Sequence, residues 1–283
     1  MCPCSPNAGF RRCADRGRGM VDDGLDGPDD PKDRNFVTAL ARGLEVLRCF
    51  RPNETELTNT DFAERTGLPK PTVSRLTHTL CKLDYLVAAP RTGTYRLGAG
   101  VLRLGFGVLA GLDIGERAAE LMRGLRNGPN SYITVALGER HRLEVIYVAV
   151  RRSRETVSLS MNVGSRLPLF HSAAGRALLV AMPEAERDEV FDLVARDMPE
   201  QMDDCRKILE SAIAEHAKHG FCRGYGEWRA DVNGIAVPVA ALNSARSYAL
   251  NTGGPSFHVS PEELESTYAE RLREAAAILS SPI

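Results

Sequence analysis

The sequence has no long uninterrupted apolar segment and no excess of charge of either sign. Its N-terminal region lacks the continuous hydrophobic stretch of a signal peptide. The apolar stretch from Ala99 to Leu112 is too short, and too often interrupted by glycine, to span a bilayer. We therefore expect no membrane association. The formal net charge of the 283 residues is −1, so any strongly charged surface must be local.

The seven cysteines form neither a metal-binding nor a disulfide pattern. Three lie within the first 13 residues without a second pair at ligand spacing, and two more fall in helical patterns, which predicts small core residues. Cys205 and Cys222 are weak candidates for redox sensing. Because free cysteines in a chain without an export signal indicate a reducing compartment, we expect a cytoplasmic protein.

Motifs for catalysis are also scarce. His171 and Ser172 are neighbours in sequence, which seldom lets a base face a nucleophile, and no glycine-flanked serine elbow is present. His216 and His219 have the spacing of half a metal site, but no cysteine or acidic cluster completes it. We expect no enzyme and no cofactor. A metal-responsive regulator, a thiol-responsive regulator or an enzyme that uses the C-terminal half remain the alternatives.

The stretch from Thr58 to Leu80 has the pattern of a helix, a tight turn and a second helix. Thr58 is placed to cap the first helix, with Asp61 in the capping-box position. Gly67 stands where the helix must end with a positive φ, and Pro71 suits the first turn of the next helix. Such helix pairs also occur in ordinary helical domains, so this pattern alone does not decide the function.

The second helix is expected to have one apolar and one polar face. The apolar residues recur at intervals of three, four and three: Val73, Leu76, Leu80 and Leu83. The opposite face carries Thr72, Ser74, Arg75, Thr77 and His78. From Lys70 to Arg96 five basic residues accompany one acidic residue, a local net charge of +4. A polar, basic helix face suits the major groove of DNA, where base edges present donors, acceptors and methyl groups.

A hairpin follows and favours a winged helix-turn-helix. Two short strands, Leu86 to Ala88 and Tyr95 to Leu97, flank a loop that contains glycine. We expect Thr72, Ser74 and Arg75 to read bases, and basic residues to hold phosphates. The predicted DNA-binding residues are Lys70, Pro71, Thr72, Ser74, Arg75, His78, Arg91 and Arg96.

The remaining segments suggest an α+β protein with two domains. We expect a disordered arm over residues 1–35, in which Met20 is an alternative start, and a winged helix-turn-helix over 36–98. Its first helix, from Val37 to Phe50, should pack an apolar stripe beneath the helix pair. Residues 99–127 predict linker helices whose excess apolar surface pairs with a second chain.

Residues 128–283 predict the second domain, with antiparallel or mixed strands and intervening helices. The expected strands are Tyr132 to Leu137, Arg142 to Val150, Val157 to Met161, Ile235 to Val239 and Tyr248 to Thr252. The expected helices are Ala173 to Ala181, Pro183 to Ala195, Asp203 to His219 and a final helix through Leu279 that opens with a capping box at Ser260.

From about Phe36 to Leu279 the chain resembles the isocitrate lyase regulator (IclR) family of bacterial transcription factors. The matching stretches in the first half are Ala39 to Phe50, Ala63 to Leu76 and Tyr95 to Gly98. Those in the second half are Gly164 to Leu169, Ser172 to Leu179, Gly234 to Val239 and Gly253 to Pro255. The resemblance implies a repressor or activator that binds double-stranded DNA, a linker that forms dimers, and a C-terminal GAF-like effector domain that often brings dimers into tetramers.

The resemblance also implies a small-molecule effector, often a carboxylic or aromatic acid, on the C-terminal sheet. Carried over by position, the effector-binding residues are Ser172, Ala173, Ala174, Gly224, Glu227, Gly234, Asn251, Thr252 and Gly253. The chain departs from the family where Phe170 replaces a histidine and where Asn251 and Gly253 replace frequent serines. Phe170 and Trp228 indicate a more apolar pocket that suits an aromatic ligand.

Overall fold

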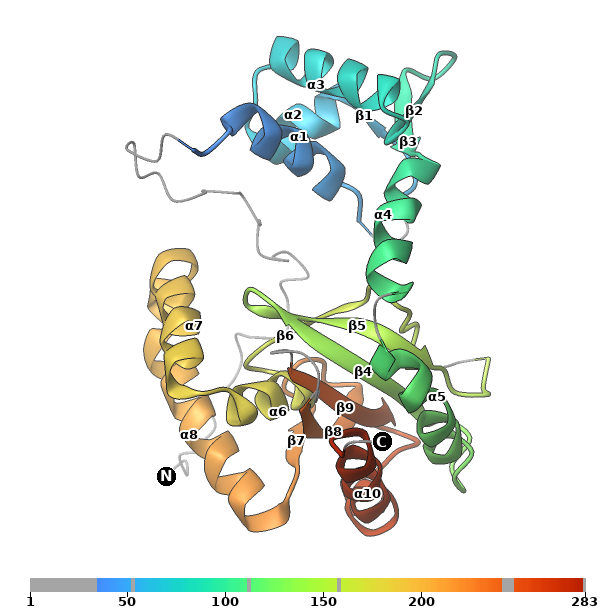
Figure 1. The fold of residues 1–283 in the computed structure, drawn as a ribbon, viewed down its shortest axis with the longest axis vertical. Coiled ribbons are helices and arrows are strands. Elements are labelled where there is room, and N and C mark those ends of the chain that lie inside the picture. The colour runs from blue at the N-terminus through green and yellow to red at the C-terminus, as the bar shows by residue number, and fades with distance from the viewer. Residues whose placement is uncertain (1–34, 52–53, 111–112, 157–158, 241–246, 282–283) are drawn as a thin grey trace, which may run out of the picture. The chain divides into compact units, whose positions relative to one another are not determined.

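The computed structural model describes residues 35–51, 54–110, 113–156, 159–240 and 247–281, and all structural statements below concern these residues. The predicted arm, with Met20 and the first three cysteines, lies outside them apart from Asn35. The chain divides into two compact units, Met1–Val108 and Leu109–Ile283 (Figure 1). In the described part, no helix has both the length and the apolar character needed to cross a membrane.

The first unit is a winged helix-turn-helix. Its helices are α1 (Thr38–Arg48), α2 (Asn59–Thr66), α3 (Lys70–Lys82) and α4 (Ala99–Ala110), the last reaching into the second unit. Its strands are β1 (Leu57–Thr58), β2 (Leu86–Ala89) and β3 (Thr94–Leu97), in the antiparallel order β1-β3-β2. The expected fold class is confirmed, and strand β1 is an addition that the sequence pattern did not show.

Local side-chain chemistry sets the ends of α2. The Thr58 hydroxyl accepts a hydrogen bond from the Asp61 amide, and the Asp61 carboxylate accepts one from the Thr58 amide at 2.7 Å. This reciprocal pair satisfies two amides that a helix start leaves free. Gly67 ends the helix with φ +65°, a left-handed conformation that glycine adopts without cost. The predicted capping box and glycine stop are confirmed.

Three expectations for the first unit are wrong. The apolar stripe of α1 does not pack under the helix pair along its length, because Val37, Leu40 and Leu44 are 61%, 63% and 47% exposed while Val46 is buried. Leu83 follows the last turn of α3 and is exposed rather than buried. Thr77, expected on the polar face, is fully buried because its hydroxyl hydrogen-bonds within the domain.

Glycine at the start of α4 permits a close backbone contact. A Cβ at Gly98 would lie 2.2 Å from the carbonyl oxygen of Asp84, and one at Gly100 would lie 2.8 Å from the same atom. The amide of Gly98 donates to Tyr85 and that of Gly100 to Asp84. The Gly98-Ala99-Gly100 sequence therefore joins α4 to the turn after α3.

The second unit is a six-stranded antiparallel sheet covered by helices on both faces (Figure 1). The strands are β4 (Thr134–His141), β5 (Glu144–Arg151), β6 (Arg166–Pro168), β7 (Cys222–Tyr225), β8 (Val232–Ala240) and β9 (Ser247–Pro255), in the order β6-β5-β4-β9-β8-β7. The helices are α5 (Asp113–Arg126), α6 (Ala173–Ala181), α7 (Glu184–Asp197), a 3-10 turn (Pro199–Gln201), α8 (Met202–His219), and α9 (Pro261–Glu263), a π-turn (Leu264–Tyr268) and α10 (Ala269–Leu279) in series.

Two apolar cores lie on opposite faces of this sheet. One joins α5 and α10 to the sheet and contains Ile114, Ala118, Met122 and Leu125. The other lies beneath α6, α7 and α8. The expectation that the apolar face of α5 pairs with a second chain is wrong, because that face is buried within its own unit. Exposed apolar residues remain on α4, where Leu102, Leu104, Phe106 and Val108 are all more than half exposed.

Several boundaries in this unit also differ from expectation. The β4–β5 turn lies at Arg142, whose φ of +55° reverses the chain, rather than at residues 138–141. Residues 159–161 are not a strand, while residues 157–158 lie outside the described residues. At Ser260 only one hydrogen bond of the expected capping box forms, from the Glu263 amide to the Ser260 hydroxyl. The Glu263 carboxylate accepts a hydrogen bond from Asn130 instead. Strands β6 and β7 were not expected.

Candidate nucleic-acid interface and ligand pocket

The polar face of α3 is open to solvent. Ser74, Arg75 and His78 are exposed along it, Lys70 and Pro71 are exposed at its start, and Thr72 is half-buried. Arg91 and Arg96 on the wing are exposed as well. Within the described residues, none of the four cations Lys70, Arg75, Arg91 and Arg96 takes part in an ion pair. Their charges are therefore available to an external anion.

The buried side of α3 holds that face in place. Val73 and Leu80 lie in the core of the unit, and the Thr77 hydroxyl lies 3.2 Å from Asn59 Oδ1. Arg65, by contrast, is a structural cation. It donates to the Cys49 carbonyl at 2.7 Å and to Glu54 at 2.6 Å, and this pairing lowers the pKa of the Glu54 carboxyl.

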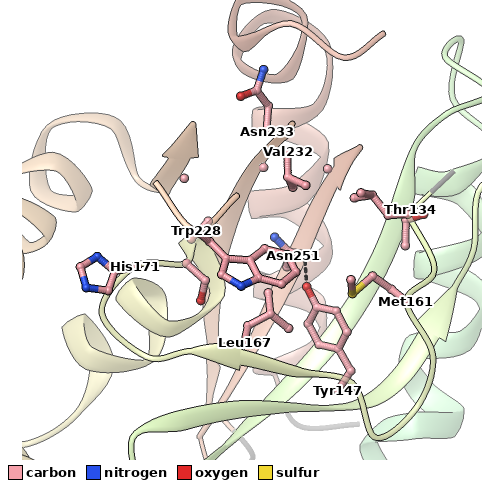
Figure 2. Close-up of a pocket in the computed structure, with 15 residues that line it drawn as sticks. Thr134, Tyr147, Met161, Leu167, His171, Trp228, Val232, Asn233 and Asn251 are labelled. Carbon is pink, nitrogen blue, oxygen red and sulfur yellow. Dashed lines mark hydrogen bonds between the residues drawn. The ribbon is translucent and has the colours of Figure 1, made fainter. Parts of the chain in front are cut away.

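A pocket lies in the second unit where the start of α6 meets the sheet (Figure 2). Its empty volume is about 470 Å³, a figure that includes open space at the mouth. Apolar side chains make much of the wall: Leu159, Met161, Leu167, Trp228 and Val232. The polar or small lining residues are Thr134, Tyr147, His171, Ser172, Ala173, Gly224, Asn233, Gly234, Asn251 and Gly253.

Glycine leaves the hollow open on the strand side. A Cβ at Gly224 would lie 2.8 Å from the amide nitrogen of Ala173, and one at Gly253 would lie 2.4 Å from the carbonyl oxygen of Asn233. Gly234 is the direct partner of both Gly224 and Gly253 in the sheet. Three strands thus present bare backbone to the pocket, and at Gly224 the backbone approaches α6 more closely than a side chain would permit.

The start of α6 is the part of the pocket suited to an anion. Ser172 caps the helix: its hydroxyl donates to the Pro168 carbonyl at 2.7 Å and accepts from the Gly175 amide at 3.1 Å. The hydroxyl is therefore fully engaged. The amides of Ala173 and Ala174 stand at the first two helical positions, where no intrahelical acceptor exists, and the helix dipole favours negative charge there.

A tyrosine–asparagine pair lies on the sheet side of the pocket. The Tyr147 hydroxyl lies 2.8 Å from Asn251 Oδ1, and Asn251 Nδ2 donates to the Ile235 carbonyl at 3.2 Å (Figure 2). Tyr147 is only 3% exposed, and burial raises the pKa of its phenol, which stays protonated.

The structure brings six of the nine predicted effector residues to the pocket wall: Ser172, Ala173, Gly224, Gly234, Asn251 and Gly253. The other three lie outside it. Ala174 is buried among the residues beneath α6. Glu227 is exposed and pairs with Arg176 at 3.1 Å. Thr252 is fully buried, and because strand residues alternate it points to the opposite face from Asn251 and Gly253.

Several lining residues were not among the predicted ones, most notably Tyr147, Thr134 and Asn233. Alternation along each strand marks which residues share a face, but only the pairing of β5, β4, β9 and β8 brings those faces together. Phe170 packs against Phe191 in the core, whereas Trp228 does line the pocket. His171 also lines it, and burial, followed by the charge of Arg176, lowers its pKa, so the imidazole is mainly neutral at pH 7.

The candidate sensor residues lie in unreactive surroundings. Cys205 and Cys222 are buried, and burial raises the pKa of the Cys222 thiol to about 12. Burial also lowers the pKa of His216, which disfavours a protonated histidine at the end of α8. In the part of the chain that the structure describes, no three His, Cys, Asp or Glu side chains are grouped closely enough to hold a metal ion.

Comparison with known proteins gives a consistent result over nearly the whole chain. Residues 106–281 match the family model described as the bacterial transcriptional regulator IclR C-terminal domain, and residues 39–90 match the IclR helix-turn-helix domain. The chain is 35% identical over 241 residues to the HTH-type transcriptional regulator TsaQ1/TsaQ2 of Comamonas testosteroni, covering 84% of this chain and 86% of that protein.

Two solved structures are similar to this one. An IclR family transcriptional regulator from Brucella abortus superposes with a TM-score of 0.78 and 41% identity, covering 94% of this chain and 99% of its own. An IclR homologue from Microbacterium hydrocarbonoxydans, complexed with 4-hydroxybenzoate, has a TM-score of 0.65 and 25% identity, covering 86% of this chain and 97% of its own.

Proposed function

The chain belongs to the IclR family of bacterial transcriptional regulators, and we propose that an aromatic carboxylate bound in its C-terminal pocket controls how tightly α3 binds an operator. One observation carries the proposal. The chain combines an exposed, unpaired cationic helix face in one unit with a largely apolar pocket in the other. The first is suited to DNA and the second to a small ligand.

The ligand class follows from the lining. Trp228, Met161 and Leu167 offer an apolar surface to a ring. In the described part of the chain no lysine or arginine lines the pocket, so a carboxylate would be held by the main-chain amide of Ala173. The relative that carries 4-hydroxybenzoate supports this class of ligand. Glu227 and Thr252 would then act from outside the wall, Glu227 by pairing with Arg176 of α6.

On DNA, a dimer would place two copies of α3 in successive major grooves roughly 34 Å apart. Thr72, Ser74, Arg75 and His78 would face base edges, while Lys70, Arg91 and Arg96 would contact phosphates. The exposed apolar residues of α1 and α4 support a homodimer formed through this part of the chain. Tetramers formed through the C-terminal domains remain part of the proposal.

The test measures both sites in one preparation. Differential scanning fluorimetry with benzoate, 4-hydroxybenzoate and small aliphatic carboxylates reports binding to the pocket as a rise in melting temperature. Fluorescence anisotropy with labelled fragments from upstream of the gene then reports DNA affinity with and without each ligand. We expect an aromatic acid to raise the melting temperature and to change DNA affinity, since an effector must bind the two DNA-binding states unequally. Absence of DNA binding at low salt would overturn the proposal.

A further inference from the structure

The side chain of Tyr147 crosses a neighbouring strand to reach its partner. The strand order is β5-β4-β9, so β4 lies between Tyr147 on β5 and Asn251 on β9. Tyr147 pairs with Gly138 of β4, and a Cβ at Gly138 would lie 3.4 Å from the Tyr147 ring. Asn251 pairs with Ala136, another small residue. Small residues on β4 thus let the ring lie across the strand.

The direction of each hydrogen bond in this pair is fixed by a main-chain group. The carbonyl oxygen of Ile235 can only accept, so the Asn251 atom that faces it at 3.2 Å must be the amide nitrogen. The other amide atom, which faces Tyr147 at 2.8 Å, is therefore the oxygen. The Tyr147 hydroxyl must donate its single proton to Asn251. The Tyr147 oxygen can then only accept a further hydrogen bond.

Several other polar side chains on the wall are already engaged. The Ser172 hydroxyl both donates and accepts within the protein, and Thr134 Oγ1 accepts from the Ser153 amide at 3.1 Å. Asn233 Nδ2 donates to the Val259 carbonyl at 2.9 Å. The Tyr147 oxygen, in contrast, keeps a lone pair, and Asn251 keeps one N–H and one lone pair.

We propose that Tyr147 and Asn251 form a specificity-determining pair in which the Tyr147 oxygen accepts a hydrogen bond from a hydroxyl or amide on the ligand and disfavours a second carboxylate at that position. This inference rests on the proposed function, in which the first carboxylate lies at the start of α6. The pair selects hydroxylated aromatic monocarboxylates over aromatic dicarboxylates of similar size.

The rejection has a definite physical cause. A carboxylate brought against Tyr147 would face the lone pair of an oxygen whose proton is directed at Asn251. If Tyr147 turned its proton toward the ligand, Asn251 Oδ1 would lose its donor beside a tyrosine that is only 3% exposed. Both arrangements leave an acceptor unsatisfied, which is costly when buried.

Isothermal titration calorimetry on the full chain tests this with benzoate, 3-hydroxybenzoate, 4-hydroxybenzoate, terephthalate and 4-carbamoylbenzoate. One neutral hydrogen bond should make the better hydroxybenzoate bind roughly three- to tenfold more tightly than benzoate. Terephthalate should bind more weakly than 4-carbamoylbenzoate, which has the same shape but carries N–H donors in place of the second charge.

Two variants of the pair and one control variant separate the pair's role from a structural one. Tyr147→Phe should abolish the preference for hydroxylated ligands, while benzoate still binds. Tyr132→Phe changes a tyrosine that does not line the pocket, so the preference for hydroxylated ligands should be unchanged. Asn251→Ser should free the Tyr147 proton and narrow the difference between terephthalate and 4-carbamoylbenzoate. Melting curves would confirm that each variant is folded.

The outcomes distinguish this inference from the function on which it rests. Equal binding of benzoate and both hydroxybenzoates, or a hydroxyl preference that survives in Tyr147→Phe, would overturn the role of the pair and leave the aromatic-acid ligand intact. If none of the five compounds bound, the ligand class itself would be wrong, and the inference would end with it.

Discussion

At the scale of single residues, the same side-chain type has opposite roles within one small domain. Arg65 is held by the Cys49 carbonyl and Glu54, and its charge is neutralised inside the fold. Arg75 is exposed on α3 with no ion pair in the described part of the chain. A partnerless exposed guanidinium is suited to a bidentate contact with a guanine edge, whereas a paired one is not. Charge alone does not distinguish the two; their partners do.

We predict that Arg75→Ala lowers affinity for the operator by about 1–3 kcal/mol while nearly preserving affinity for a scrambled duplex, because base contacts carry sequence preference. Fluorescence anisotropy against both duplexes measures this difference.

Arg91→Ala on the wing is the matched comparison, since it is expected to contact a phosphate. It should weaken binding to both duplexes alike and reduce the slope of log affinity against log salt by about 0.9. Equal losses on both duplexes for Arg75→Ala would assign Arg75 to the phosphates instead.

At the scale of secondary-structure elements, the pocket depends on how closely α6 lies to the turn before it. A Cβ at Gly175 would lie 1.9 Å from the Leu169 carbonyl oxygen, a distance at which the backbone must move. Gly124 on α5 is also helical, but a Cβ there would have no atom within 4 Å. Glycine is therefore required for packing in α6 and is dispensable in α5.

We predict that Gly175→Ala destabilises the protein by about 3 kcal/mol or more, because overpacking against backbone cannot be relieved by a side-chain rotation. Gly124→Ala should stabilise it by about 0.5–1 kcal/mol, since alanine loses less conformational entropy in a helix. Urea denaturation of the two variants measures both effects. Similar free energies of unfolding would contradict the close approach at Leu169.

Helix α7 is tied to the β4–β5 turn by Asp197, which accepts hydrogen bonds from Arg196 at 2.7 Å and from Arg142 at 2.7 Å. The pKa of Asp197 lies below its usual value. The hydrogen bond from Arg196 is the largest cause, and the hydrogen bond from Arg142 lowers the pKa further. A lowered folded pKa adds stability that is complete above the unfolded pKa of about 3.9 and disappears as the pH falls through the folded value.

Asp197→Asn should therefore be less stable than the natural protein by about 1 kcal/mol at pH 7, an amount reduced by partial exposure of the pair. The difference should shrink as the pH is lowered below about 4. Urea denaturation at a series of pH values measures this. A difference that is constant with pH would assign the effect to packing rather than to charge.

At the scale of the whole molecule, regulation requires the two units to be coupled, and such coupling is reciprocal. If a ligand weakens operator binding tenfold, the operator must weaken ligand binding by the same factor. Oligomer formation enters here as well. The apolar residues of α5 are buried in their own unit, so α1 and α4 carry the exposed apolar surface that a dimer would cover.

We predict that Leu102→Glu and Phe106→Glu, at residues that are 74% and 67% exposed, convert the proposed dimer to monomers and reduce operator affinity. Burying a charge in an apolar interface is costly, and loss of one half-site contact weakens binding to the palindrome. Light scattering coupled to size-exclusion chromatography measures the mass. Ile213→Glu on α8 is a control at an exposed apolar residue, and loss of dimers there too would assign the interface elsewhere.

What the sequence by itself determined is local. The capping box at Thr58, the glycine stop at Gly67, the helix from Ala173 to Ala181 and the winged fold class depend on residues close together in the chain, whose conformational preferences act without distant partners. Family resemblance placed six of the residues that line the pocket.

Only the tertiary structure decided which faces are buried and which distant residues meet. Thr77 is buried because Asn59 lies beside it, Leu40 is exposed because no element covers it within the described unit, and α5 is closed off by its own sheet. Tyr147 and Asn251 are 104 residues apart in the sequence. They meet because the strand between theirs, β4, has small residues opposite them, over which the tyrosine ring can reach. Such contacts depend on strand order and on the sizes of neighbouring side chains, which no local preference encodes.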